Sequence, residues 1–518
     1  MILITGSTIP LARALIAHLP ATQLRLYTND PRADPGTTSG EYTGDLCDRT
    51  FVDRLVAGVT TIIHLDPIDE TLDPDVAVAH ASCGTYQLVD AAANAGVRKV
   101  VLASTLALFN RLPASWQVTE EWRPRPTAAS AELCAWLAEC SARALTRDTG
   151  LAVVCLRFGQ ITARDDAGLL ADARQVHIAD ALHAVECALA YPQLGWSIFH
   201  IAAAGEYAKL RVRAAGEAAF GYQPRYAVAR AALPGASAES WRNALAPSAP
   251  VASRPIRRVV MLGAGGPVGV AAAALLGQEY TLHLTDIQLL AEIAARNEPQ
   301  SPGAPVPVPT LPPHTEAIVD IGNYAQVYAA CAGADAIINC SVMRRDPVAA
   351  FRVNTLGAYH VMRAAVAHGI RRVVHTGPYQ IAPSGITSYG WDHEIHADAP
   401  PRPGRAHGWQ IYFHSKYLGQ EICRVYAEHY GLEVPVLLFA DFVDAALPPY
   451  REVHSLAVSF QDAARAIRCA LVVPTLPNPY EPLHIGADLP HGVFPNEKAR
   501  RVLEWQPLDD LQGWWDRS

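Results

Sequence analysis

The sequence lacks the marks of several classes of protein. Its ten cysteines are scattered without any Cys-x-x-Cys pair, which argues against a zinc module or a disulfide framework and predicts a reducing, cytoplasmic setting. No run approaches the roughly 20 apolar residues that a membrane span needs. A net charge of −8 disfavours a nucleic-acid binder, and a hydrophobic content of 50% disfavours a disordered chain. We therefore expect a globular protein that binds neither nucleic acid nor membrane.

The 518 residues are enough for several domains, and the two halves repeat each other. The repeated segments are Ile2–Gly6 with Val259–Gly263, Gly84–Val101 with Gly357–Val374, Gly150–Leu156 with Gly431–Phe439, and Asp180 with Asp462. A Pro-rich insert, residues 299–313, is found only in the second half, and we interpret it as an extended loop without a packed role. The pattern predicts two duplicated domains, residues 1–233 and 256–518, joined by a linker at 234–255.

Each half alternates short apolar strands with helical segments of about 12 to 18 residues. This pattern predicts an α/β fold: two tandem Rossmann-like domains, each a doubly wound parallel sheet covered by helices on both faces. Ligands of such sheets bind at the carboxyl ends of the strands, where the chemistry is expected.

A glycine-rich turn opens the second half. Gly263, Gly266 and Gly269, with Val268 beside them, follow a predicted strand and precede a helix, as in turns that let the backbone approach a pyrophosphate. The next strand ends in Asp286, whose carboxylate suits ribose hydroxyls and repels a 2′-phosphate, so NAD is predicted over NADP. The alternative is that Asp286 caps the turn into the helix starting near Leu289.

A Tyr-x-x-x-Lys pattern opens a later helix. Tyr412 and Lys416 are four residues apart, so both side chains lie on one face of that helix. A lysine ammonium near a tyrosine favours the phenolate, which can act as a general base toward a substrate hydroxyl. The pair predicts acid–base catalysis.

With these motifs in order, both halves resemble the extended short-chain dehydrogenase/reductases, the NAD-dependent epimerase/dehydratase group. The resemblance implies that Tyr412 and Lys416 are the catalytic pair and that the cofactor lies along Asp320, Ile321, Cys340, Ser341 and Asn354. More narrowly, Leu284–Ile287, Asn354–Gly357 and Ser455–Asp462 are similar to segments of sugar-oxidising members such as uronate dehydrogenases.

The second half departs from the family at one position. Members usually place Ser or Thr after the fifth strand to contact the reacting oxygen, whereas Gly377-Pro378 aligns there. We expect Thr376 to supply the missing hydroxyl, with Tyr379 as the alternative donor.

A polar, aromatic segment precedes Tyr412 and is predicted to meet a carbohydrate substrate. Within it, Arg402 or Arg405 can pair with a substrate carboxylate, against the simpler interpretation of a solvated loop. Asp392, His393 and His396 lack a strong zinc spacing, so no metal is predicted.

The first half is interpreted as a degenerate copy. Ile9 and Ala12 replace the second and third glycines after Gly6, and Ala131 and Ala135 fill the Tyr and Lys positions. Thr105 keeps the family's hydroxyl but has no base. Because family members dimerise through the helix that carries the Tyr and Lys, we hypothesise an internal pseudo-dimer, with a homodimer as the alternative.

The sequence therefore predicts an NAD-dependent oxidoreductase acting on a sugar or sugar-acid hydroxyl. An NAD-dependent sugar-nucleotide epimerase/dehydratase is the alternative within enzymes, and a non-catalytic dinucleotide-binding sensor is the alternative outside them.

Overall fold

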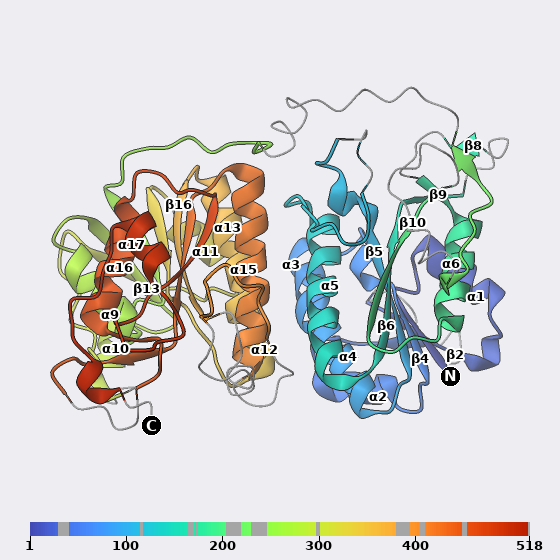
Figure 1. Cartoon of the computed structure of the whole chain (residues 1–518), viewed down its shortest axis with the longest axis horizontal. Coiled ribbons are helices and arrows are strands. Elements are labelled where there is room, and N and C mark those ends of the chain that lie inside the picture. The colour runs from blue at the N-terminus through green and yellow to red at the C-terminus, as the bar shows by residue number, and fades with distance from the viewer. Residues whose placement is uncertain are drawn as a thin grey trace. The chain divides into compact units, whose positions relative to one another are not determined.

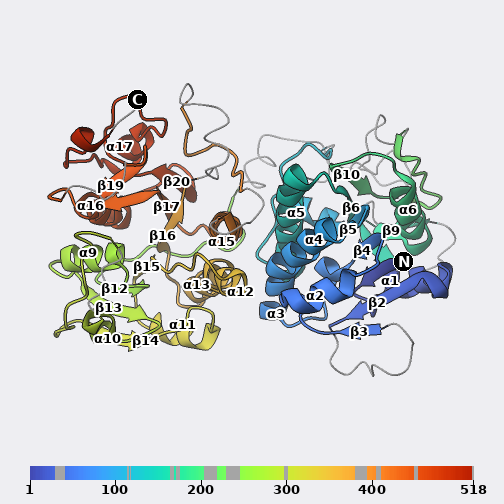
Figure 2. The same ribbon diagram turned by 90° about the horizontal axis from the view of Figure 1, so that it is seen from below.

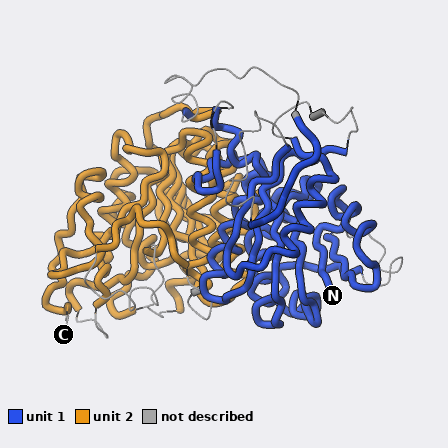
Figure 3. The backbone as a smooth tube through the Cα atoms, turned by 45° about the vertical axis from the view of Figure 1, so that its right-hand side comes forward, with its two compact units in different colours: residues 1–246 blue, residues 247–518 orange. Residues whose placement is uncertain are grey.

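The chain divides into two compact units, residues 1–246 and 247–518 (Figure 3). The computed structural model describes residues 1–29, 41–113, 116, 118–163, 169–170, 175–203, 219–228, 246–296, 301–379, 394–403, 410–447 and 453–515. Each unit is built on one seven-stranded sheet whose neighbouring strands are all parallel (Figure 1).

The sheet of unit 2 has the strand order β14-β13-β12-β15-β16-β17-β20. Its strands are β12 (Arg258–Leu262), β13 (Thr281–Asp286), β14 (Thr315–Ile318), β15 (Ala336–Asn339), β16 (Arg372–Pro378), β17 (Val434–Phe439) and β20 (Tyr480–His484). The chain order reverses between β12 and β15, which places the ends of these two strands at the point where such sheets bind ligands.

Helices cover both faces of this sheet (Figure 2). On one face α9 (Pro267–Leu276) packs against α16 (Phe460–Val472), and on the other α13 (Gly357–Ala367) packs against α11 (Tyr324–Ala330) and α15 (Gln410–Tyr430). The remaining described elements of unit 2 are α10 (Leu290–Ala295), α12 (Pro347–Ala350), the π-helical turn η5 (Phe351–Leu356), α17 (Glu497–Leu503), η6 (Gln512–Trp514) and the pair β18 (Asp441–Val443) and β19 (Ala457–Ser459). The central strands β12, β15, β16 and β17 are mostly apolar because both of their faces are buried, whereas the edge strand β14 is partly exposed.

Unit 1 repeats this order as β3-β2-β1-β4-β5-β6-β10. The strands are β1 (Ile2–Thr5), β2 (Leu24–Thr28), β3 (Glu41–Thr43), β4 (Thr61–His64), β5 (Lys99–Thr105), β6 (Ala152–Phe158) and β10 (Trp196–Ile201). The helices are α1 (Pro10–His18), α2 (Arg49–Val56), α3 (Pro74–Ala79), α4 (Thr85–Asn94), α5 (Ser130–Thr149) and α6 (Ile178–Ala190). Short elements complete it: η1 (Ala21–Gln23), η2 (Asp66–Ile68), η3 (His80–Gly84), η4 (Leu106–Phe109), β7 (Gln160–Thr162) paired with β9 (Gln175–His177), and β8 (Leu169–Leu170) paired with β11 (Ala227–Val228).

The predicted fold class, two tandem Rossmann-like parallel-sheet domains, is confirmed. The Pro-rich insert forms no helix or strand over residues 301–313, but it is not wholly unpacked. Ala304 is buried, and the Cα of Gly303, with φ +70°, lies so close to Asp444 that any side chain there would collide with it. The prediction of an insert without a packed role is therefore wrong at this point.

The described end of the predicted linker is docked on unit 2. The backbone N–H of Ser248 donates to the carbonyl of His429 at 2.9 Å, and that of Val251 donates to Tyr430 at 2.9 Å. Pro247 contacts Gly431, so the segment fastens to the end of α15.

Candidate active site

The glycine turn after β12 is built for close approach of backbones. Gly263 has φ +77°, and a Cβ on it would lie 2.7 Å from the backbone N of Ser341. A Cβ on Gly269 would lie 2.6 Å from the carbonyl O of Gly263. Gly266 is different, because its nearest neighbour would be 3.7 Å away, which leaves its outer side open. Two glycines therefore pack the turn, and the third leaves an open cradle at the N-terminus of α9, where a pyrophosphate is predicted to bind. Val268 lies in the first turn of α9 and is partly buried against the core.

Asp286 ends β13 and holds the same turn. Its carboxylate accepts hydrogen bonds from the backbone N–H of Gly265 at 2.9 Å and of Ile287 at 2.8 Å. It is not the cap of α10, because that helix begins at Leu290 with Leu289 as its N-cap. Each carboxylate oxygen has a further lone pair, so the side chain can still accept from ribose hydroxyls.

Asp320 and Ile321 follow β14 and contact residues of η5 and α13. The Asp320 carboxylate accepts from the backbone N–H of Gly322 at 2.8 Å and pairs with Arg352. Ile321 is buried, and its side chain would lie 3.0 Å from a Cβ on Gly357. This contact explains the glycine at the start of α13.

Cys340 and Ser341 follow β15 and lie against the glycine turn. The backbone N–H of Cys340 donates to Leu262 at 2.8 Å, and burial raises the pKa of its thiol to about 12. The Ser341 N–H donates to Asn339 Oδ1 at 3.1 Å, and its carbonyl accepts from Lys416 Nζ at 2.8 Å.

Asn354 ties the loop after β15 to α15. Its Oδ1 accepts from the backbone N–H of Met343 at 3.1 Å, and its Nδ2 donates to the carbonyl of Met343 at 2.7 Å and to Ser415 Oγ at 2.9 Å. Both N–H groups of the amide are used within the chain. Asn354 therefore positions residues near the predicted cofactor path, while direct contact with the cofactor stays a prediction.

Tyr412 and Lys416 begin α15 at the carboxyl end of the sheet. Lys416 is 1% exposed, and its Nζ donates to the carbonyls of Ser341 at 2.8 Å and Thr376 at 3.1 Å. Burial lowers the pKa of Lys416 to about 8. Burial also raises the pKa of Tyr412, partly offset by the nearby cation of Arg344. The expected lowering of the tyrosine pKa is therefore absent in the chain alone, because desolvation outweighs the positive charges.

The missing hydroxyl after β16 has a structural explanation. Gly377 and Pro378 belong to β16, and a side chain on Gly377 would collide with Nε2 of Gln420, a buried amide nitrogen with no hydrogen-bond partner among the described residues. Thr376 Oγ1 donates to the carbonyl of Asn339 at 3.0 Å. Tyr379 packs against Phe413, with ring centroids 5.2 Å apart, and burial raises its pKa.

Several predicted residues lie outside the described ones, namely Arg405, Asp392 and His393. Arg402 is exposed, and His396 is an exposed side chain 3.7 Å from Glu394. Across the ranges that the structure describes, no group of three or more His, Cys, Asp or Glu side chains is arranged to hold a metal. Within the same ranges, no helix combines the length and apolarity of a membrane span.

Unit 1 has a crevice of about 1330 Å³ at the carboxyl ends of its strands. Ile9 of the former glycine turn, Thr105, Ala131 and His80 are among the residues that line it. The crevice thus presents an alanine where the pattern of the second half places its tyrosine.

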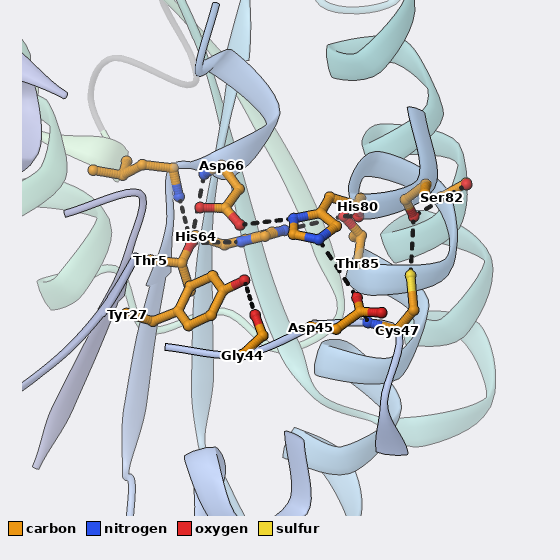
Figure 4. Close-up of polar contacts among 12 residues, drawn as sticks. Thr5, Tyr27, Gly44, Asp45, Cys47, His64, Asp66, His80, Ser82 and Thr85 are labelled. Carbon is orange, nitrogen blue, oxygen red and sulfur yellow. Dashed lines mark hydrogen bonds and ion pairs between the residues drawn. The ribbon is translucent and has the colours of Figure 1, made fainter. Parts of the chain in front are cut away.

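Asp45 and His80, which line this crevice, belong to a charged cluster with Asp66 (Figure 4). His80 is between two carboxylates, 3.5 Å from Asp45 and 3.8 Å from Asp66. Burial lowers the pKa of His80, but the nearby carboxylates of Asp45 and Asp66 outweigh it and raise the pKa to about 10. A Cβ on Gly6 would lie 3.2 Å from Asp66, where the matching contact of Gly263 is with Ser341. A carboxylate thus replaces a serine beside the turn.

Sequence reasoning missed three of these residues: Arg344, Gln420 and Asp66. Arg344 adjoins the predicted cofactor segment at Ser341, and Gln420 is one helical turn beyond Lys416, so spacing alone was the available signal. The contact of Arg344 with Tyr412 and that of Gln420 with Gly377 depend on how strands and helices pack.

Curated relatives match about half of the chain. Two uronate dehydrogenases, from Pseudomonas putida and Pseudomonas syringae pv. tomato, are 27% and 26% identical, covering 42% and 52% of this chain and 73% and 81% of theirs. An NAD-dependent glucose-6-phosphate dehydrogenase of Haloferax volcanii is 23% identical over 49% of this chain and 93% of its own. A solved glucuronic acid dehydrogenase of Chromohalobacter salexigens is 20% identical, with a TM-score of 0.41, over 50% of this chain and 87% of its own.

The family model described as the NAD dependent epimerase/dehydratase family matches residues 2–192 and 259–443. The predicted family, the tandem duplication, the NAD cofactor and the enzymatic character are confirmed. One match in each unit accounts for most of both sheets, so the chain belongs to the NAD dependent epimerase/dehydratase family in tandem duplicate.

Proposed function

We propose that this chain is an NAD-dependent dehydrogenase that oxidises a hydroxyl of a sugar or sugar acid. Residues 256–518 hold the working site, residues 1–233 are a degenerate copy, and 234–255 link them. The names of the curated relatives support this substrate class, since two are uronate dehydrogenases and one is a glucose-6-phosphate dehydrogenase.

The observation that carries the proposal is the placement of Tyr412 and Lys416. Lys416 Nζ donates to the carbonyls of Ser341 and Thr376, at the ends of two adjacent strands. Ser341 in turn lies against Gly263 of the cradle. In this proposal, the helix of the acid–base pair and the glycine turn meet at the carboxyl ends of the central strands β12, β15 and β16.

Each group of residues in the proposed site has its own role in binding or catalysis. Gly263, Gly266 and Gly269 give the pyrophosphate its cradle, and Asp286 accepts from the ribose. NAD, when bound, accepts a hydride from the substrate carbon. Tyr412 takes the hydroxyl proton. Burial raises its pKa and the cation of Arg344 partly offsets that rise. In this proposal the ammonium of Lys416 favours the phenolate in the same direction.

Unit 1 lacks the second and third glycines of the turn and the Tyr/Lys pair. Besides Ile9, Ala12 and Ala131, the carboxylate of Asp66 lies beside Gly6, where it repels a pyrophosphate. We infer that unit 1 holds no NAD and serves a structural role, the internal pseudo-dimer being our working hypothesis. Expression of residues 256–518 alone tests it, and a stable, fully active monomer would contradict it.

The test is turnover of the full chain with NAD and a panel of hexuronates, hexose phosphates and neutral hexoses, measured as NADH absorbance. NADH formation that is lost in Tyr412→Phe supports a dehydrogenase. The family match keeps a second candidate, an epimerase or dehydratase, which recycles its NAD. Native mass spectrometry of the purified chain separates the two, since one retained NAD without net NADH formation favours the second candidate.

A further inference from the structure

The loop after β15 places an arginine against the catalytic tyrosine. The guanidinium carbon of Arg344 lies 5.6 Å from the ring centroid of Tyr412. The residue is partly exposed, so a solute can reach it. The position is within reach of a small molecule that the Tyr412 phenol contacts.

The backbone next to Arg344 is fixed. Both polar backbone groups of Met343 are bonded to the amide of Asn354, and the same amide donates to Ser415, the residue before Lys416. Gly419 allows this close packing, because any side chain there would collide with the carbonyl of Asn354. Arg344 is thus presented from a loop anchored to α15, the helix that carries the acid–base pair.

The charge of Arg344 is uncompensated within the described ranges. Two neighbouring arginines of unit 2 do have carboxylate partners: Arg352 pairs with Asp320, and Arg372 with Glu433. No ion pair joins Arg344 to any carboxylate of the described residues. A half-exposed guanidinium beside a reacting group, with its planar fork of donors free, suits a bidentate anion.

We propose that Arg344 binds the carboxylate of the substrate and so selects sugar acids over neutral sugars. This inference rests on the proposed function, since it names the substrate group that the same site recognises. Asn354 is then a positioning residue that holds the loop of Arg344 against α15.

The test is a titration of the NAD-loaded full chain with a hexuronate, a hexose 6-phosphate and a neutral hexose by calorimetry, together with steady-state kinetics. Arg344→Gln is expected to weaken hexuronate binding and raise its KM by about ten- to hundredfold, with little change in the affinity or KM for the neutral hexose, while kcat falls for both sugars because the cation near Tyr412 is lost. Arg344→Lys should recover part of the loss. Arg345→Gln, the same charge change one residue further on, is the matched control.

The outcomes distinguish the sources of the anion. A loss of affinity confined to the hexose 6-phosphate, equal losses of affinity for charged and neutral sugars, or a loss of NAD affinity instead of sugar affinity would each overturn the carboxylate assignment. If the wild-type chain turns over no sugar, the proposed dehydrogenase fails. The calorimetry then still tests Arg344, because absent or Arg344-independent hexuronate binding overturns this proposal as well.

Discussion

The amide of Gln420 occupies the space that a side chain at Gly377 would need. Its Nε2 is buried, has no hydrogen-bond partner in the part of the chain that the structure describes, and would collide with a Cβ on Gly377. Unit 1 shows the alternative arrangement at its matching position, where Ser104 Oγ donates to Glu139 at 2.5 Å on α5. The two units therefore differ at both facing positions: Ser104 faces Glu139 in unit 1, and Gly377 faces Gln420 in unit 2.

Gly377→Ser is expected to destabilise the chain by about 1–3 kcal/mol, because the new Cβ forces the Gln420 amide out of its place. In the double variant with Gln420→Ala, the cost of Gly377→Ser should be smaller than in the wild-type background. Urea denaturation of the four chains of this cycle measures the coupling. Strict additivity of the two changes would show that Gly377 and Gln420 do not compete for the same space.

Gly269→Ala is expected to lower NAD affinity by at least about tenfold, because its Cβ would lie 2.6 Å from the carbonyl of Gly263 and must open the turn. Fluorescence titration with NAD measures the effect. Ala12→Gly, at the matching position of unit 1, is the control and should leave the NAD affinity unchanged.

Native mass spectrometry completes this test. We expect at most one NAD per chain in the wild type and in Ala12→Gly. Two bound NAD molecules would contradict the inference that unit 1 holds none.

Tyr412→Phe should lower kcat by about 10²–10⁴, since the general base is lost while the fold and the cofactor cradle stay intact. NAD affinity, measured separately, should stay within about twofold, because the phenol is not part of the cradle. Tyr328→Phe, an exposed tyrosine on α11, is the control. An active Tyr412→Phe enzyme would rule out the assigned acid–base role.

Lys416 gives the stability a defined pH dependence. Its pKa of about 8 in the folded chain is below its ordinary 10.5, so the unfolded chain holds the proton more tightly. The cost of burying the ammonium is present in full below pH 8, and stability is regained as the pH rises toward 10.5, by up to about 3 kcal/mol.

The measurement is the free energy of unfolding of wild type and Lys416→Met by urea denaturation at several pH values. The difference between the two should grow in favour of the wild type between pH 8 and 10.5. A difference that does not vary over this range would mean that Lys416 titrates at its ordinary pKa in the folded chain.

The local patterns of the sequence determined much of this protein. The apolar runs, the glycine turn and the repeat of both along the chain predict two parallel sheets, because strand and helix periods and tight turns are set by neighbouring residues. The four-residue spacing of Tyr412 and Lys416 likewise predicts that both side chains lie on one face of a helix, because helix geometry is local.

Only the tertiary structure decided what these residues contact. Lys416 reaches the carbonyls of Ser341 and Thr376, which are 75 and 40 residues away, because β15 and β16 are neighbours in the sheet. The tie from Asn354 to Ser415 and the carboxylate of Asp66 beside Gly6 arise in the same way. Such contacts depend on strand order and helix packing, which bring distant segments together. The local periodicity of the sequence does not show them.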